Sequence, residues 1–87
     1  MSKILIVDDE LIVRESLTKW FRQDGYRVES AEDANHALKL MSEGPWDLAL
    51  LDIKMPGMSG LELQKRLKEI DKNTGVLMIT AFASVES

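Results

Sequence analysis

A short apolar run that ends in a carboxylate is the feature that most limits how this chain can fold. Residues 48–51 are all apolar, and Asp52 follows them directly. Turn-forming residues lie on both sides, at Gly44-Pro45 and at Pro56-Gly57. An apolar run this short between two turns is typical of a central strand that is covered on both faces. We therefore expect residues 47–52 to form a buried strand that presents Asp52 at its carboxyl end.

Three other segments have strand character. Residues 3–7 and 75–80 are also apolar without alternation, which predicts two more strands covered on both faces. Residues 26–30 alternate between apolar and polar side chains, as expected of a half-exposed strand at the edge of a sheet. The strand at residues 3–7 is followed by Asp8 and Asp9, so it repeats the acidic ending of the central strand.

The segments between the strands have the spacing of amphipathic helices. Asp33 is a suitable N-cap for the second helix, and residues 59–62 form an S-x-x-E capping box for the third. The apolar stripes that define the three helices are Val13, Leu17, Trp20 and Phe21, then Ala34, Ala37, Leu38 and Met41, then Leu63, Leu67 and Ile70. Strands that alternate with helices predict an α/β domain with a parallel sheet and helices on both of its faces.

Length, charge and residue usage exclude several classes of protein. The chain has 87 residues, which suits a single small domain, and its net charge of -4 argues against nucleic-acid binding because no basic face is segregated. Cysteine is absent, so disulfides and thiolate metal sites are excluded. The apolar stretch near the N-terminus is too short for a signal peptide, and no segment is long enough for a membrane span. We expect a cytoplasmic, soluble protein without membrane partners.

Oxygen-bearing side chains follow three of the four predicted strands. Asp8 and Asp9 follow the first, Asp52 ends the third and Thr80 ends the fourth. Because functional crevices of open α/β sheets lie at the carboxyl ends of the strands, we expect these four side chains to converge. Three carboxylates repel one another unless a cation compensates their charge. An all-oxygen ligand set suits Mg²⁺, with Mn²⁺ as an alternative, and disfavours zinc; His36, on the second predicted helix, is expected to be only a surface residue.

The acidic cluster also indicates what chemistry the site could perform. A phosphate-cradling loop, as in a flavodoxin, would need glycines after the first strand instead of the acids found there. With a bound metal, Asp52 becomes a usable nucleophile toward a phosphoryl group, and the Thr80 hydroxyl could donate to a phosphoryl oxygen. An aspartyl phosphate would be the product.

These motifs resemble the receiver domain of two-component response regulators. The matching segments are residues 7–10, 52–60 and 79–82, in the family's order and spacing over the whole chain. The turn after Asp52 and residues 81–84 are most similar to the nitrogen-regulation class, whose effectors activate σ54-dependent transcription. The resemblance implies a flavodoxin-like, three-layer α/β fold with strand order 2-1-3-4.

The resemblance also implies roles for individual residues. Asp52 would accept a phosphoryl group from the histidine of a sensor kinase, and Thr80 and the Ala81 backbone N–H would contact that group. This contact would bias a two-state surface that switches a transcription-regulating effector. Mg²⁺ would be held by Asp8, Asp9, Asp52 and the backbone carbonyl of Lys54, with Asp8 acting chiefly through water. Such a domain is not an enzyme of metabolism, because it promotes only its own phosphorylation and dephosphorylation.

Compared with the family pattern, residues 1–87 are expected to be a C-terminally truncated receiver domain. The family's fifth strand, with its invariant Lys and switch aromatic, and the helices around it have no counterpart here, and neither Lys54 nor Phe82 is a sound substitute. We expect weakened phosphorylation as a result. We also expect self-association through residues 75–80, because this apolar strand would lie at the open edge of the sheet.

Two alternative functions remain open at the level of sequence. The chain could be an assembly module that acts only through protein contacts, without productive phosphorylation. A Mg²⁺-dependent aspartyl phosphatase of the haloacid dehalogenase type is a weaker alternative. That type needs a second Asp two residues after the nucleophile, where this chain has Lys54 after Asp52, or Leu11 after Asp9.

Overall fold

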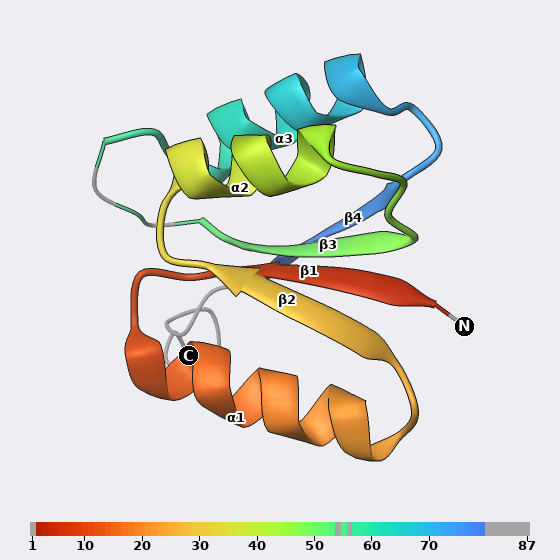
Figure 1. Cartoon of the computed structure of the whole chain (residues 1–87). Coiled ribbons are helices and arrows are strands. Elements are labelled where there is room, and N and C mark those ends of the chain that lie inside the picture. Colours follow the sequence, from red (N-terminus) through yellow and green to blue (C-terminus); the bar gives the residue numbers. More distant parts are fainter. Residues whose placement is uncertain (1, 54, 56, 80–87) are drawn as a thin grey trace, which may run out of the picture.

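The predicted strands and helices are all present in the computed structural model, which describes residues 2–53, 55 and 57–79 (Figure 1). No strand boundary in these ranges differs from the expected one by more than one residue. Within the same ranges, none of the helices is both long and apolar enough to cross a membrane. In chain order the elements are β1 (Lys3–Val7), α1 (Leu11–Gln23), β2 (Arg27–Ala31), α2 (Ala34–Ser42), β3 (Leu48–Asp52), α3 (Gly60–Ile70) and β4 (Gly75–Ile79).

The four strands form one parallel sheet in the order β2-β1-β3-β4. This order confirms the flavodoxin-like α/β fold that the sequence resemblance implied. Val7 at the end of β1 lies opposite Ala31 of β2 and Leu51 of β3. Because these strands end in register, the residues that follow β1 and those that end β3 meet at one edge of the sheet.

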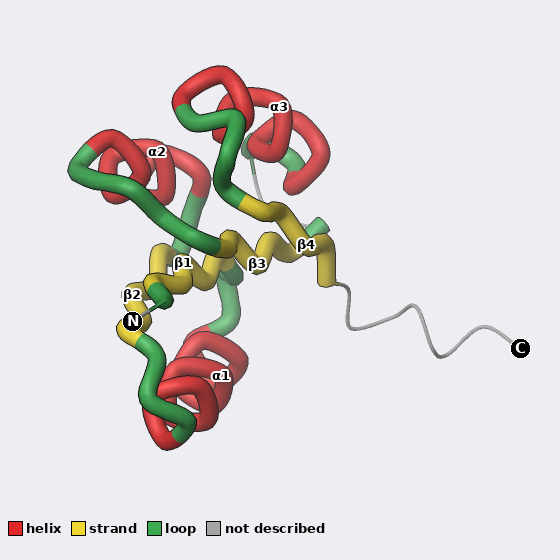
Figure 2. The backbone as a smooth tube through the Cα atoms, turned by 90° about the vertical axis from the view of Figure 1, so that its right-hand side faces the viewer, coloured by secondary structure: helices red, strands yellow, loops and turns green. Residues whose placement is uncertain are grey.

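Helices cover the sheet on both faces, α1 on one side and α2 with α3 on the other (Figure 2). Successive side chains of a strand point to opposite faces, so β1 contributes to both cores. Leu5 and Val7 belong to the core beneath α2 and α3, whereas Ile4 and Ile6 belong to the core beneath α1. This double coverage explains why β1 and β3 are apolar without alternation.

The two cores are unequal. No residue of α1 is buried, although Leu17 and Phe21 pack against the sheet from that helix. The buried residues on the α1 side are Ile4, Ile6, Val28 and Leu50. Those on the side of α2 and α3 are Leu5, Val7, Ala31, Ala34, Ala37, Met41, Trp46, Ala49, Leu51, Met55, Leu63 and Leu67. Most of the apolar burial therefore lies between the sheet and the α2–α3 layer.

Three large apolar side chains that were expected to be covered are exposed. Trp20 is 60% exposed, because Leu17 and Phe21 already occupy the side of α1 that faces the sheet. Ile70 is 48% exposed at the last residue of α3, and Leu77 is 54% exposed on β4, so β4 is not covered on both faces. Trp46, by contrast, is a core residue with only 4% of its surface exposed.

The two predicted N-caps make their capping hydrogen bonds, whereas α1 begins without a side-chain cap. The Asp33 side chain accepts a hydrogen bond from the His36 N–H at 2.8 Å, and Ser59 accepts one from the Glu62 N–H at 3.3 Å. The carboxylate of Glu62 lies 3.4 Å from Arg66 Nε. Glu10 occupies the N-cap position of α1 without a side-chain capping bond. Acids near a helix start can thus serve functions other than capping.

The two edges of the sheet differ in how their backbone is protected. The Arg27 N–H donates to the Ser2 carbonyl, and the Ala31 carbonyl accepts from the Asp8 N–H, so both face the β1 side. The backbone of Val28, between them, points to the open side of β2. There the guanidinium of Arg22 donates to the Val28 carbonyl at 2.9 Å. On β4, the backbone of Val76 and Met78 points to the open side, and no partner for it exists within residues 2–53, 55 and 57–79. Within the part of the chain that the structure describes, the β2 edge is thus capped by a side chain, whereas the β4 edge has no backbone partner.

Candidate functional site

Three aspartates meet at the carboxyl ends of β1 and β3. Asp8 and Asp9 follow β1, and Asp52 is the last residue of β3. One carboxylate oxygen from each residue lies within 4.8 Å of the other two. The structure therefore brings together the three carboxylates that the sequence placed at this edge.

Asp8 is the most firmly held of the three. Its residue is only 5% exposed, and its N–H donates to the Ala31 carbonyl at 3.1 Å. Its Oδ1 accepts a hydrogen bond from the Glu10 N–H at 2.9 Å. Its own carbonyl accepts a hydrogen bond from Arg14 Nη1 at 2.8 Å. Backbone and side chain of Asp8 are thus fixed by β2 on one side and by the start of α1 on the other.

The other two aspartates are more accessible. Asp9 is exposed and Asp52 is half-buried. A carboxylate at the end of a central strand that still reaches solvent can be approached by another molecule, which a phosphoryl transfer requires. The burial gradient from Asp8 to Asp9 gives the site a fixed inner residue and an open outer one.

The donor set of this cluster fits a divalent metal. All three donors are carboxylate oxygens, the ligands that Mg²⁺ and Mn²⁺ prefer, and the described residues place neither cysteine nor histidine among them. Without a cation, three negative charges this close repel one another. The residues present therefore suit a Mg²⁺ site at the sheet edge.

Gly60 supports the site from behind, which the sequence analysis did not foresee. Its N–H donates to the Ile53 carbonyl at 3.0 Å at the start of α3. A Cβ at this position would collide with the backbone carbonyl of Asp52. Only glycine therefore allows α3 to begin this close to the end of β3. The sequence signal was a glycine directly after the helix N-cap, which capping rules alone do not explain.

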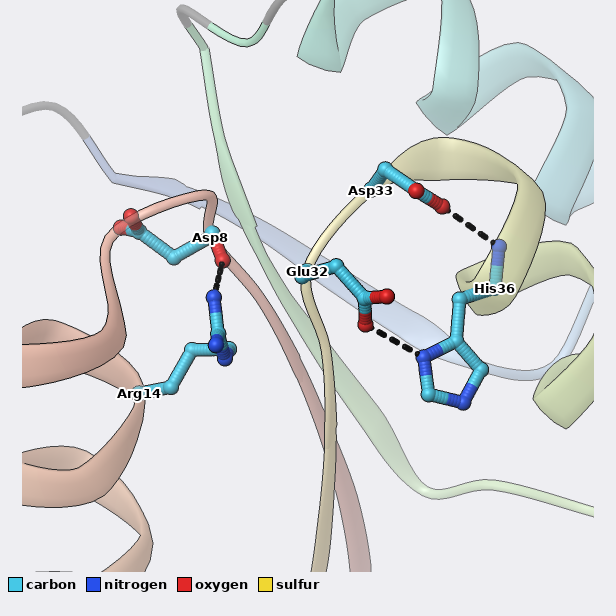
Figure 3. A network of polar contacts seen from close by, with 5 residues as sticks. All are labelled: Asp8, Arg14, Glu32, Asp33 and His36. Carbon is cyan, nitrogen blue, oxygen red and sulfur yellow. Dashed lines mark hydrogen bonds and ion pairs between the residues drawn. The ribbon is translucent and has the colours of Figure 1, made fainter.

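An exposed hydrogen bond between a histidine and a carboxylate flanks the cluster at the end of β2. His36 Nδ1 lies 2.7 Å from Glu32 Oε1, beside the capping contact of Asp33 (Figure 3). The hydrogen bond from His36 lowers the pKa of the Glu32 carboxyl below its ordinary value of 4.5. His36 is not one of the clustered ligands, in agreement with its expected place at the surface.

A groove of about 770 Å³ runs between α1 and the open edge of β2. Among the described residues, its lining includes Arg14 but none of the three aspartates. The aspartate cluster is the candidate site, because convergent carboxylates carry specific chemistry and a surface groove alone does not.

Several predicted site residues lie outside the described residues. These are Thr80, Ala81 and the Lys54 carbonyl. Their expected contacts with a phosphoryl group or a metal remain predictions. The aspartate cluster is the part of the predicted site that the structure places.

Comparison with known proteins identifies the family. Residues 4–87 match the model of the response regulator receiver domain. Sporulation initiation phosphotransferase F of Bacillus subtilis is 42% identical over 84 residues, which are 97% of this chain and 68% of that protein. The transcriptional regulatory protein ResD of the same organism is 38% identical over 92% of this chain, but only 33% of its own length is covered.

Solved structures agree with the sequence match. The response regulator TrrA of Thermotoga maritima, solved in complex with Mg²⁺–BeF, superposes with a TM-score of 0.89 at 38% identity. The match covers 99% of this chain and 75% of TrrA. A structure of TrrA in complex with the histidine kinase ThkA superposes with a TM-score of 0.88 at 39% identity, covering 100% of this chain and 75% of that one. The fold, the aspartate cluster and these matches together show that the chain belongs to the response regulator receiver domain family.

Proposed function

We propose that Asp52 is the phosphoryl acceptor of this receiver domain. The observation that supports this most is its position: it ends the central strand, remains half-exposed and lies within reach of two further carboxylates. In the proposed transfer, a carboxylate oxygen of Asp52 bonds to phosphorus while the bond between phosphorus and a kinase histidine nitrogen breaks. The electron pair of the broken bond stays on that nitrogen.

Asp8, Asp9 and Asp52 are the residues that would hold Mg²⁺. The ion supplies positive charge that offsets the carboxylates and a phosphoryl group. Asp8 and Asp9 are suited to different parts of this task, because Asp8 is held by hydrogen bonds within the protein and Asp9 is exposed to solvent. The relation to TrrA, which was solved with Mg²⁺–BeF, supports the same assignment.

The proposed partner is a sensor histidine kinase, and the proposed output is control of a transcription-regulating effector. The complex of TrrA with ThkA supports the first part, and the similarity to ResD supports the second. Similarity to the nitrogen-regulation class in the turn after Asp52 and in residues 81–84 favours an effector that acts with σ54. The domain would act as a switch and would catalyse only its own phosphorylation and dephosphorylation.

Intact-mass analysis tests this function directly. The chain is incubated with a small-molecule phosphodonor and Mg²⁺, and an increase by one phosphoryl group is expected. Asp52→Asn should show no increase, whereas Asp24→Asn, at an exposed acid that ends α1, should behave as the wild type. An adduct that persists in Asp52→Asn would refute the assignment of Asp52.

Self-association through β4 is a second proposed property. Among the described residues, the backbone of Val76 and Met78 has no partner on the open side of this strand, and Leu77 adds an exposed apolar side chain. An uncharged strand with an open edge can pair with the same strand of a second copy. If no phosphoryl adduct forms, this contact makes an assembly module the alternative function.

A further inference from the structure

We propose that Arg14 is a positioning residue for the metal site, because it fixes the backbone of Asp8 from the second turn of α1. This inference rests on the proposed metal-dependent function and adds a residue to it. Arg14 contacts neither the proposed phosphoryl acceptor nor the exposed Asp9 in any described hydrogen bond. Its effect would pass through Asp8.

The geometry of the contact supports this role. Arg14 Nη1 donates to the Asp8 carbonyl at 2.8 Å, while the Asp8 carboxylate is turned away from the guanidinium (Figure 3). The same carboxylate accepts the Glu10 N–H at 2.9 Å. Two contacts from the start of α1 therefore hold one residue, one through its carbonyl and one through its Oδ1.

The position of Arg14 distinguishes it from an ordinary surface arginine. Asp8 is the first residue after β1, so its carbonyl is not part of the regular β1 ladder. A buried carbonyl at a strand end needs a donor, and here a side chain supplies it. Arg14 also lies near enough to Glu32 for its charge to lower the pKa of that carboxyl, though less than the His36 hydrogen bond does. The Arg14 guanidinium thus binds the backbone at the end of β1 and also acts through its charge on the acid that follows β2.

Arg14 has two effects on Mg²⁺ affinity that act in opposite directions: it holds Asp8 in place, and it adds a positive charge near the site. A nearby cation repels Mg²⁺, so removing Arg14 would tighten metal binding if charge dominated. If order dominates, removal frees the Asp8 backbone and weakens binding, because the ligands are no longer held in place. The guanidinium faces a carbonyl instead of the carboxylate, and the cluster has an exposed member, so solvent and salt screen the repulsion. We infer that order dominates.

The experiment compares Arg14→Met with Arg22→Met. Both arginines lie on α1, and both donate one hydrogen bond to a backbone carbonyl, at 2.8 and 2.9 Å. Arg22, however, contacts Val28 on the open edge of β2, away from the aspartates. Mg²⁺ affinity is measured on the whole chain by calorimetric titration at low and high salt, below the melting temperature of each variant.

We expect Arg14→Met to weaken Mg²⁺ binding about three- to tenfold at both salt concentrations. Arg22→Met should change the affinity less than about twofold, although it loses a comparable hydrogen bond. Equal affinities in the two variants, or tighter binding in Arg14→Met that fades with salt, would overturn the inference.

Failure of this inference can be told apart from failure of the proposed function. If the wild type binds Mg²⁺ but forms no phosphoryl adduct, the proposed function fails, while the ratio between the two variants still tests Arg14. If the wild type forms the adduct and Arg14→Met binds Mg²⁺ with the same affinity as the wild type, only the inference about Arg14 fails. A wild type that binds no Mg²⁺ would overturn both.

Discussion

Gly60 lies directly against the backbone carbonyl of Asp52, so close that no side chain fits between them. The first residue of α3 and the last residue of β3 are thus in contact without an intervening side chain. The turn that joins them therefore carries the proposed phosphoryl acceptor on one end and a helix start on the other.

Gly60→Ala should destabilise the protein by about 1–3 kcal/mol, because the added methyl group forces the backbone of Asp52 or the side chain of Met78 to move. Chemical denaturation measures the loss. Gly44→Ala is the matched control, since a Cβ there meets only Lys3 Nζ, at 3.8 Å. If both variants unfolded at the same denaturant concentration, the close approach would not explain why position 60 needs glycine.

Thr74→Val should also cost about 1–3 kcal/mol. The Thr74 hydroxyl is fully buried and lies 2.9 Å from the Trp46 carbonyl and 3.1 Å from Asp71 Oδ2, so valine leaves these acceptors without it. Thr18→Val is a contrasting variant, because Thr18 Oγ1 is buried without a partner among the described residues. Valine at position 18 should be neutral or stabilising. Equal losses at the two positions in denaturation curves would contradict this explanation.

Glu32 should contribute to stability in a pH-dependent way. Its pKa is lowered in the folded state, chiefly by the hydrogen bond from His36, so its contribution is present above the ordinary value of 4.5. The contribution is lost as the pH falls through the lower folded-state pKa. Denaturation midpoints of the wild type and Glu32→Gln should therefore differ near neutral pH and converge in acid. Glu29→Gln, at an exposed acid of β2, serves as the control. If its midpoints differed from the wild type near neutral pH and converged in acid in the same way, the effect would not come from the contact of Glu32 with His36.

Leu77→Lys should reduce self-association. The substitution places a charge on the open edge strand, where it must be desolvated if a second strand pairs with β4. Leu61→Lys is the control, because Leu61 is similarly exposed, at 57% against 54%, but lies on α3. Sedimentation at high protein concentration measures the effect. A wild type that stays monomeric would remove the basis of this prediction.

Local patterns in the sequence predicted the parallel sheet and placed acids at the carboxyl ends of two of its strands, whereas the strand order was implied by the resemblance to receiver domains. The acids that follow β1 and end β3 are adjacent once the sheet is parallel and these two strands are neighbours, and no detail of side-chain packing is needed. The exposure of Trp20 could not be predicted, since its helical spacing fits the apolar stripe and only the packing of Leu17 and Phe21 decides which side faces the sheet.

The contacts of Gly60 and Arg14 were beyond sequence analysis for a related reason. A glycine after an N-cap residue looks like a local helix signal, whereas the actual constraint comes from a carbonyl eight residues earlier. The arginine looks like one of several surface cations, and its bond to the Asp8 carbonyl depends on the angle at which α1 leaves the sheet. Interactions with the backbone leave little trace in residue type.

The absence of any buried residue in α1 has a consequence for motion in solution. Segments with few buried contacts open at lower free-energy cost than the rest of a domain. The α1 layer should therefore open locally, with fast amide hydrogen exchange, while β1 and β3 remain closed. Because Glu10 and Arg14 hold Asp8 from this layer, each opening would also release the inner carboxylate. The proposed metal ligands thus lie between β1 and β3, which should be the parts best protected from amide exchange, and α1, which should be the least protected.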